Sequence, residues 1–303
     1  MVTRREFLGT FGAAAAFAPS ALRRAKAVQT PPQRGQMRFG YAAITWGADI
    51  DKAIDDIAAV GFRGIQLRGE AFAQYGDRPA ALREQLERHK LAFAVLSSGN
   101  LSIDPAREPE MLALHVQHAR FVRDCRGQCL QIIDERPKGR AVVGDDYRRL
   151  GRLMTELGKR TADVGVPLVY HHHMNSTGEK PQEVRAVLDA ADPRHVRLLF
   201  DVAHYQQGGG DPVAAIREYR EWIEVVHLKD VRSIGSGGSA GYEFVELGRG
   251  RVNLPGVFAA LRDIAFDKWA IVELDRVPDP GRTPKESAEM NKRYLIERAG
   301  EIV

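Results

Sequence analysis

The chain has 303 residues, of which 44% are hydrophobic and 28% are charged, and this composition is that of an ordinary globular protein. It excludes the disordered, collagen-like and disulfide-framework classes. A formal charge of +4 and a sequence pI of about 9.1 would by themselves suggest a nucleic-acid or anionic-membrane partner.

The excess of basic residues lies at the N-terminus. The opening residues contain the pair Arg4-Arg5 and resemble a twin-arginine export signal, because an alanine-rich apolar run (Thr10 to Ala21) and an Ala-x-Ala cleavage pattern (Ala25 to Ala27) follow. That run is about half the roughly 20 residues of a membrane span, which favours a removed signal over an uncleaved anchor. Residues 1–27 hold five of the 44 basic and one of the 40 acidic residues, so the remainder has 39 of each and no net charge. We therefore expect a periplasmic protein exported by the twin-arginine pathway, with no nucleic-acid partner and no stable membrane insertion after signal removal.

Residues 28–37 lack periodicity and are predicted to be a disordered lead-in, and a single catalytic domain is predicted over residues 38–303. In this domain short apolar runs alternate with amphipathic stretches in eight strand-then-helix units. The predicted strands are Phe39–Trp46, Gly64–Leu67, Ala92–Leu96, Cys129–Ile133, Pro167–His173, Val196–Asp201, Val225–Leu228 and Trp269–Glu273. The predicted helices are Asp49–Val60, Ala80–His89, Glu108–Arg123, Asp146–Val164, Pro181–Ala190, Pro212–Tyr219, Pro255–Ile264 and Lys285–Ala299.

This alternation implies parallel strands that are covered on both faces. Eight units in about 265 residues match an α/β fold of the (β/α)₈ TIM-barrel type. A doubly wound open sheet is disfavoured, because no G-x-G-x-x-G follows the first strand.

Polar side chains gather where the last four strands end. His171–Asn175 ends the fifth strand, Asp201–His204 the sixth, His227–Asp230 the seventh and Glu273–Asp275 the eighth. In a barrel these ends meet at the rim that holds the active site. Two imidazoles and two carboxylates from neighbouring strands predict a site for one divalent metal ion, Mn²⁺ foremost, with Co²⁺, Fe²⁺ or Zn²⁺ as alternatives. Each residue also has a structural interpretation, such as a helix cap for Asp201 or a core histidine for His227, but their coincidence at one rim favours the metal.

Four segments around these residues resemble inosose dehydratase and its relatives, in the xylose isomerase-like barrel superfamily of sugar isomerases, epimerases and lyases. The segments are Leu168–Met174, Leu198–His204, Val226–Arg232 and Glu246–Gly250. The resemblance implies a ligand set of His171, Asp201, His227 and Glu273, in which His171 stands where the epimerases have glutamate. Since that glutamate is one of the epimerases' two acid/base groups, the change argues against symmetrical epimerisation. With His171 in place of that glutamate, two carboxylates instead of three balance the charge of the metal ion, which makes the ion a stronger Lewis acid.

The resemblance and the residues together predict a lyase. The metal would bind the carbonyl and a neighbouring hydroxyl of a keto-sugar or keto-cyclitol and stabilise an enediolate, while a base removes the α-proton and a β-substituent departs. The candidate bases are Glu273 and His173. The candidate acids are His204, Lys229 and Glu246. The candidate substrate-binding residues are Trp46, as an apolar face or as a plug of the barrel mouth, Gln131 and Asn100.

Other functions stay open at this point. A ketose isomerase or epimerase would use the same metal site. A noncatalytic sugar-binding protein would use the rim only to bind its ligand. The glycine-rich stretch Ser233–Gly241 is expected to be either a mobile cover of the rim or an exposed linker. Superfamily members are often dimers or tetramers, so a homo-oligomer is compatible with the resemblance.

Overall fold

The computed structural model describes residues 36–234, 241–301 and 303. The predicted signal peptide (1–27) and residues 28–35 of the predicted lead-in lie outside these residues. Within the described part of the chain, Met37 is already buried in the hydrophobic core. None of the helices in that part combines the length and the apolar character that crossing a membrane requires.

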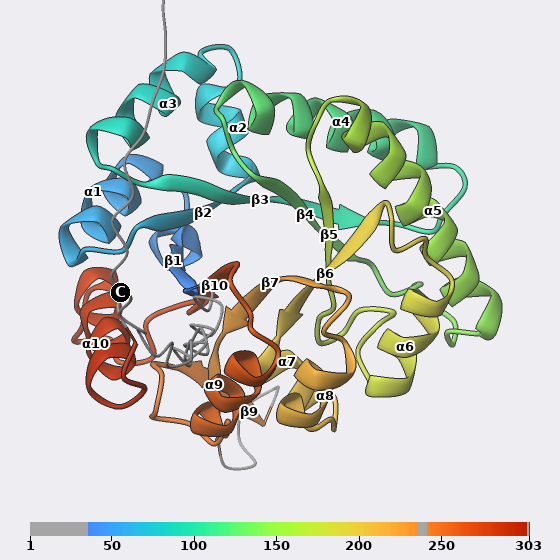
Figure 1. Cartoon of the computed structure of the whole chain (residues 1–303). Coiled ribbons are helices and arrows are strands. Elements are labelled where there is room, and N and C mark those ends of the chain that lie inside the picture. The colour runs from blue at the N-terminus through green and yellow to red at the C-terminus, as the bar shows by residue number, and fades with distance from the viewer. Residues whose placement is uncertain (1–35, 235–240, 302) are drawn as a thin grey trace, which may run out of the picture. The chain divides into compact units, whose positions relative to one another are not determined.

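Eight parallel strands close into a barrel with helices around it (Figure 1), which confirms the predicted fold class. Their order around the barrel is β1-β10-β7-β6-β5-β4-β3-β2. The strands are β1 (Arg38–Ala42), β2 (Gly64–Arg68), β3 (Ala92–Leu101), β4 (Cys129–Asp134), β5 (Leu168–His171), β6 (Val196–Asp201), β7 (Ile223–Leu228) and β10 (Trp269–Val272). Each predicted strand has a counterpart, because buried runs rich in β-branched and aromatic residues favour strands that are covered on both faces.

Two strand ends differ from the prediction. β1 stops at Ala42, and the next residues form the short 3₁₀ helix η1 (Ala43–Trp46). β5 stops at His171, so His172 and His173 belong to the loop that follows. The apolar or aromatic residues of 39–46 and 167–173 predict one continuous strand in each case. In the structure the chain turns away from the barrel within each of these runs.

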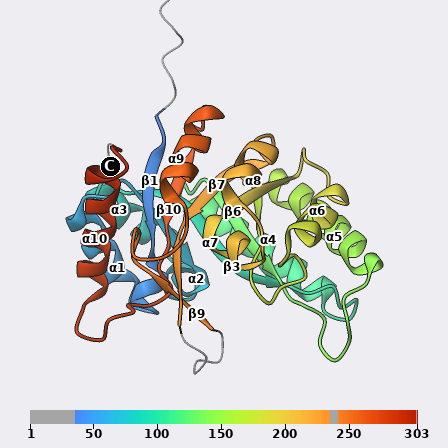
Figure 2. The ribbon, with the colours of Figure 1, turned by 90° about the horizontal axis from the view of Figure 1, so that it is seen from below.

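Helices cover the outside of the barrel (Figure 2). They are α1 (Ile50–Val60), α2 (Gly69–Tyr75), α3 (Pro79–Arg88), α4 (Glu108–Asp124), α5 (Gly144–Asp163), α6 (Pro181–Asp189), α7 (Val202–Gln207), α8 (Pro212–Glu218), α9 (Leu254–Asp263) and α10 (Pro284–Glu297). Proline stands in the first turn of six of these helices, where its missing N–H costs nothing. Only α2 and α7 have no predicted counterpart, because each has just two turns and directly follows a strand.

The hydrophobic core has two layers. The larger lies between the barrel and the helices, and a smaller one fills the barrel interior. The interior residues are Ala42, Ala94, Val95, Cys129, Val169, Leu199, Val225, Trp269 and Ile271. The barrel is therefore a packed core with its open space at the rim.

The stretch after β7 contains an antiparallel strand pair, β8 (Asp230–Ser233) and β9 (Tyr242–Val245), where a cover or linker was expected. β9 is labelled below the barrel strands in Figure 2. The carboxylate of Asp230 accepts hydrogen bonds from the backbone N–H groups of Val231, Gly248, Gly250 and Val252 at 2.8–3.0 Å, which ties β8 to the segment after β9. Residues 235–240, the centre of the expected cover, lie outside the described residues.

Candidate metal centre and its cavity

The alternation of side chains along four neighbouring strands carries four polar groups to one point above the interior core. Val169, Leu199, Val225 and Ile271 belong to that core. The residues two positions later in the sequence are, in the same order, His171, Asp201, His227 and Glu273. Because a strand repeats every two residues, these four side chains face the barrel axis one layer higher. The register places Asp201 directly beside His227.

Three distances between candidate ligand atoms are close to those expected around one metal ion. His171 Nε2 lies 3.6 Å and His227 Nδ1 lies 3.5 Å from Asp201 Oδ2. His227 Nδ1 is also 3.3 Å from Glu273 Oε2. Atoms bound at about 2.0–2.2 Å to one tetrahedral ion lie about 3.3–3.6 Å from each other. His171 Nε2, Asp201 Oδ2 and His227 Nδ1 are buried and have no hydrogen-bond partner among the described residues, so three orphaned atoms converge where an ion would sit.

Asp201 serves two purposes at once. Its Oδ1 accepts hydrogen bonds from the N–H groups of Ala203 and His204, both at 2.8 Å, and so caps α7. Its Oδ2 is the orphaned atom of the site. The helix-cap interpretation and the metal-ligand interpretation of this residue are therefore compatible, because each uses a different oxygen.

Two buried glutamines hold the two imidazoles. The Gln66 amide donates to Glu273 Oε2 at 3.2 Å, and its oxygen lies 2.8 Å from His227 Nε2. His227 therefore carries its proton on Nε2 and keeps the Nδ1 lone pair for the site. The Nε2 amide nitrogen of Gln131 lies 3.0 Å from His171 Nδ1 and donates to Ser97 Oγ at 3.2 Å. In this orientation Nδ1 accepts, and a neutral His171 carries its proton on Nε2. Turning the amide by 180° would bring the orphaned Gln131 Oε1 to Nδ1, which would then donate and leave the Nε2 lone pair for a metal ion.

The protonation states also suit a cation. Burial lowers the pKa of His171 to about 4, so its ring is neutral at pH 7. Burial alone would raise the pKa of Asp201, but His204, His171 and His227 around it bring that pKa well below its usual range. The pKa of Glu273 is about 2, since His227 and Lys229 outweigh the effect of burial. Neutral imidazoles and ionised carboxylates are the forms that bind metal.

The charges at the site leave an excess of negative charge. Lys229 is fully buried, and its ammonium donates to Glu273 Oε1 at 2.9 Å and to Asp275 Oδ1 at 2.5 Å. The same nitrogen lies 3.4 Å from His204 Nε2, which occupies its third donor direction. The site holds three carboxylates (Asp201, Glu273 and Asp275) and one ammonium, so two negative charges remain, and a divalent cation would balance them.

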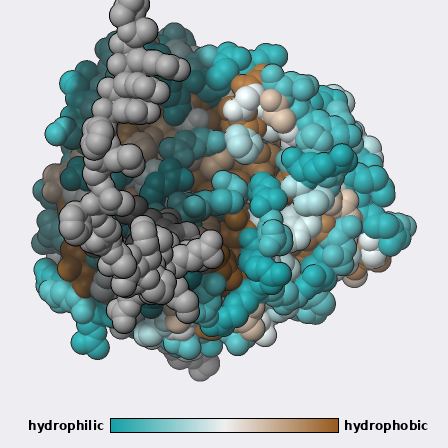
Figure 3. Space-filling view, in the orientation of Figure 1, coloured by the Kyte–Doolittle hydropathy of each residue, from teal (hydrophilic) through white to brown (hydrophobic). Residues whose placement is uncertain are grey.

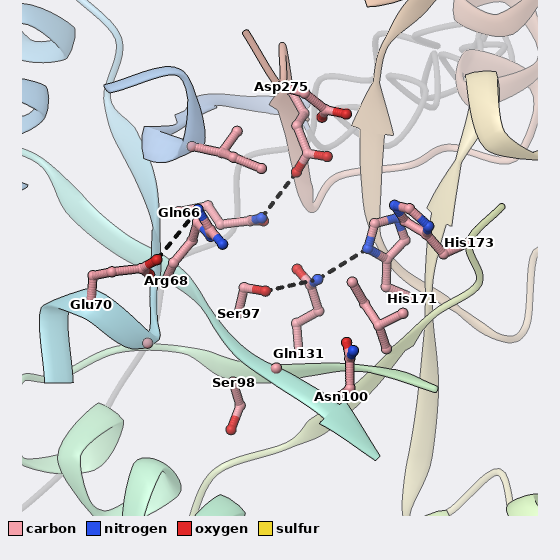
Figure 4. Close-up of a pocket in the computed structure, with 15 residues that line it drawn as sticks. Gln66, Arg68, Glu70, Ser97, Ser98, Asn100, Gln131, His171, His173 and Asp275 are labelled. Atoms are coloured by element: carbon pink, nitrogen blue, oxygen red, sulfur yellow. Dashed lines mark hydrogen bonds and ion pairs between the residues drawn. The ribbon is translucent and has the colours of Figure 1, made fainter. Parts of the chain in front are cut away.

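A cavity of about 350 Å³ opens over these groups at the carboxyl ends of β1 to β5 and β10. His171, Glu273, Gln131, Asn100 and His173 contribute to its wall. Figure 4 shows Gln131 and His171 pointing toward each other and Ser98 pointing away from the cavity. On the face shown in the space-filling view most of the described surface is hydrophilic, with hydrophobic residues visible mainly in recesses (Figure 3). The size is that of a small-molecule site.

His173 is held in one tautomer at the cavity wall. Its Nδ1 lies 2.7 Å from the carbonyl oxygen of Met174, so Nδ1 donates and Nε2 keeps a lone pair. Its ring packs against that of His204, tilted by 41°, with 3.7 Å between centroids. His172 points the other way, as the alternation predicts, and packs between Phe200 and Tyr205.

Two predicted site residues lie away from the cavity. Trp46 is buried between the barrel and α1, where its Nε1 donates to Asp56 at 2.9 Å. Glu246 is paired with Arg282 and accepts a hydrogen bond from Ser287 of α10 at 3.0 Å. His204 and Lys229 lie one layer behind the cavity wall, as their burial and partners show.

Asp275, from the polar end of the eighth strand, also lies in the wall. Several other wall residues were not singled out from the sequence: Ile44, Gln66, Arg68 and Glu70. Gln66 had a signal, since it is a polar residue inside the apolar strand Gly64-Ile65-Gln66-Leu67. Ile44 supplies the apolar face at the end of β1 that was expected from Trp46. Arg68 and Glu70 pair with each other at 3.5 Å.

The comparisons with known proteins agree with this architecture. The family described as xylose isomerase-like TIM barrel matches residues 54–294, and the chain belongs to this family. An inosose dehydratase of Lacticaseibacillus casei is 27% identical over 298 residues, covering 86% of this chain and 96% of the relative. The rhizopine catabolism protein MocC of Rhizobium meliloti is 28% identical over 297 residues, covering 87% and 89%. Among solved structures, an IOLI protein with a bound zinc atom has a TM-score of 0.72 at 17% identity, covering 86% of this chain and 97% of that one.

Proposed function

We propose that this protein is a metal-dependent lyase that removes a proton next to the carbonyl group of a keto-sugar or keto-cyclitol and expels a β-substituent. The observation that carries the proposal is the convergence of three orphaned buried atoms, His171 Nε2, Asp201 Oδ2 and His227 Nδ1, beside Glu273 at the floor of a cavity. The similarity to inosose dehydratases supports the substrate class and the lyase chemistry.

We assign His171, Asp201, His227 and Glu273 as the residues that would hold one divalent ion, with Mn²⁺ as the first candidate and Zn²⁺, Co²⁺ and Fe²⁺ as alternatives. When bound, the ion supplies Lewis acidity to the carbonyl oxygen and so makes the adjacent C–H group more acidic. A relative of this fold with a bound zinc atom supports a metal here.

Of the two candidate bases, His173 fits better than Glu273. Both oxygens of Glu273 are engaged, Oε1 by the Lys229 ammonium and Oε2 by the Gln66 amide. His173 lines the cavity, and its Nε2 lone pair is available because Nδ1 donates to Met174. We propose that Nε2 of His173 takes the α-proton and that the resulting imidazolium gives it to the departing oxygen. Lys229 then serves to hold Glu273 and Asp275, since its donors are used within the protein.

Proton exchange in D₂O tests this assignment. The protein is loaded with Mn²⁺ and given keto-inositols, 3-keto-glucosides and free ketoses, and NMR follows deuterium uptake and products. We expect exchange together with loss of water or of an alcohol. His173→Gln should lose the exchange and keep the metal, whereas His89→Gln, a matched change at a surface contact with Asp55, should change neither.

Other outcomes would point to other functions. Exchange with a rearranged but intact sugar would identify an isomerase or epimerase. Metal binding without exchange on any substrate would contradict the enzyme proposal and favour sugar capture.

We also propose export to the periplasm, on the Arg4-Arg5 pattern and the apolar run behind it. Cell fractionation tests this address, and Arg4→Lys/Arg5→Lys should keep the protein in the cytoplasm if the pathway is correct.

A further inference from the structure

A second cavity of about 350 Å³ adjoins the cavity over the metal centre. The two share Asn100, Ile133 and His173 in their walls, so they form one groove along the rim. The second cavity lies between the loop after β4 and the loop after β5, where Lys138 and Asn175 line it. We infer, on the basis of the proposed function, that the substrate is an oxidised glycoside whose second sugar ring occupies this second cavity.

The position of His173 links this cavity to the reaction. His173 stands in the wall of both cavities, and it is the residue to which we assign the proton transfer. In the proposed binding mode, the oxidised sugar ring lies over the metal centre with its α-carbon at His173. Its β-carbon, which carries the leaving group, then lies at the passage into the second cavity. A substrate such as an inosose fills only the first cavity, because its leaving group is a single hydroxyl.

The lining of the second cavity suits an uncharged, hydroxyl-rich ring. Ile133 and Met174 offer apolar contact, and Asn100 and Asn175 offer hydrogen bonds. Most of the charged groups there are already paired within the protein: Asp134 with the Tyr170 hydroxyl at 2.7 Å, Glu135 with Arg107 at 2.6 Å, and Arg136 with Glu183 at 3.4 Å.

Lys138 differs from these groups, because its ammonium has no ion-pair partner in the described part of the chain. One exposed ammonium can donate to ring or hydroxyl oxygens. A single cation is a weak basis for binding a polyanion, so a neutral sugar fits the second cavity better.

The reaction balances without any further reactant. In a 3-keto-glycoside the α-proton is on C2 and the glycosidic oxygen is on C1. Removal of the C2 proton forms the C1–C2 double bond as the C1–O bond breaks, the electron pair leaves with the oxygen, and that oxygen takes the proton. The products are an unsaturated keto-sugar and the free second sugar, with no net oxidation.

A pair of substrates tests the inference. Methyl 3-keto-glucoside and a 3-keto-disaccharide with glucose in place of the methyl group, of the same anomeric configuration, are compared by kcat/KM for release of the alcohol. We expect the disaccharide to exceed the methyl glycoside at least tenfold. Lys138→Ala and Asn175→Gly should each reduce this ratio at least threefold. Glycine keeps the positive φ of Asn175, and Lys159→Ala on the outer face of α5 is the matched control that should leave the ratio unchanged.

Binding gives an independent readout. Calorimetry with the unoxidised disaccharide should show weaker binding to the Lys138→Ala and Asn175→Gly proteins than to the Lys159→Ala protein. Equal kcat/KM values for both substrates, with ratios unaffected by the variants, would overturn the inference and leave the lyase proposal standing. Faster dehydration of a keto-inositol than of the disaccharide would overturn it as well. Absence of α-proton exchange on every substrate would overturn the lyase proposal and the inference with it.

Discussion

The buried Gln66 amide allows a quantitative prediction about metal affinity. It accepts a hydrogen bond from His227 Nε2 at 2.8 Å and donates one to Glu273 Oε2 at 3.2 Å, so one side chain orients two of the four candidate ligands. Gln66→Met removes both hydrogen bonds with little change in volume and frees His227 to adopt the other tautomer. Loss of such a supporting partner typically weakens metal binding about 10- to 100-fold, which corresponds to about 1.4–2.7 kcal/mol.

Calorimetric titration with Zn²⁺ or Mn²⁺, in competition with a chelator, measures this change. The matched control is Gln128→Met at the opposite end of the barrel, where the amide oxygen of Gln128 accepts from Trp269 at 2.8 Å. Gln128→Met should leave the affinity for metal unchanged. If Gln66→Met binds metal as tightly as the unaltered protein, or if both variants weaken it equally, the assigned role of Gln66 is wrong.

Three further changes have defined expectations. His173→Gln should abolish α-proton exchange with a change of less than about threefold in metal affinity, measured by NMR and calorimetry; retained exchange would remove His173 from the base role. Lys229→Met leaves the carboxylates of Glu273 and Asp275 without their cation. The free energy of unfolding of the metal-free protein, measured with urea, should therefore fall by about 3–5 kcal/mol. A fall below about 1 kcal/mol would contradict the role of this ion pair. Burial, with help from His118, lowers the pKa of His115 from 6.5 to about 4, so the unfolded chain takes up a proton at higher pH than the folded one. The contribution of His115 to the free energy of unfolding should be fully present above pH 6.5 and should fall by about 3 kcal/mol as the pH drops to 4. In His115→Gln the free energy of unfolding should depend less on pH over the same range.

The barrel could be predicted from the sequence because its strands carry a strong local signal. Runs such as Val196–Asp201 are apolar, flanked by polar residues and too short for helices, and this strand has the predicted bounds. The short helices α2 and α7 were not predicted, since each follows a strand without a break and neither has the proline in its first turn that marks α8, a helix as short as α2. The β8–β9 pair depends on contacts across residues 234–241, which no local pattern reveals.

The candidate ligands were accessible to sequence reasoning for a related reason. Each of His171, Asp201, His227 and Glu273 stands within one residue of the end of a strand, and a barrel brings all such ends together. Gln66 was not singled out, because its polarity inside an apolar strand does not show which residues it contacts. Its importance comes from two partners far away in the sequence, His227 and Glu273.

Long-range contacts also decide where Trp46 and Glu246 lie. The turn of η1 carries Trp46 toward Asp56 of α1, outside the barrel. Arg282 and Ser287 of α10 hold Glu246 away from the cavity. In both cases the partners that orient the side chain lie on a helix elsewhere in the chain or just before one, and the local sequence does not reveal them.

Anomalous diffraction from crystals grown with Mn²⁺ or Zn²⁺ tests the metal centre most directly. We expect one peak per chain, within about 2.0–2.3 Å of His171 Nε2, Asp201 Oδ2, His227 Nδ1 and Glu273 Oε2. The alternative grouping of His171 and Asp201 with His204 would instead place the ion toward α7. A peak in that position, or no peak among these residues at saturating metal, would contradict the assignment on which the proposed chemistry depends.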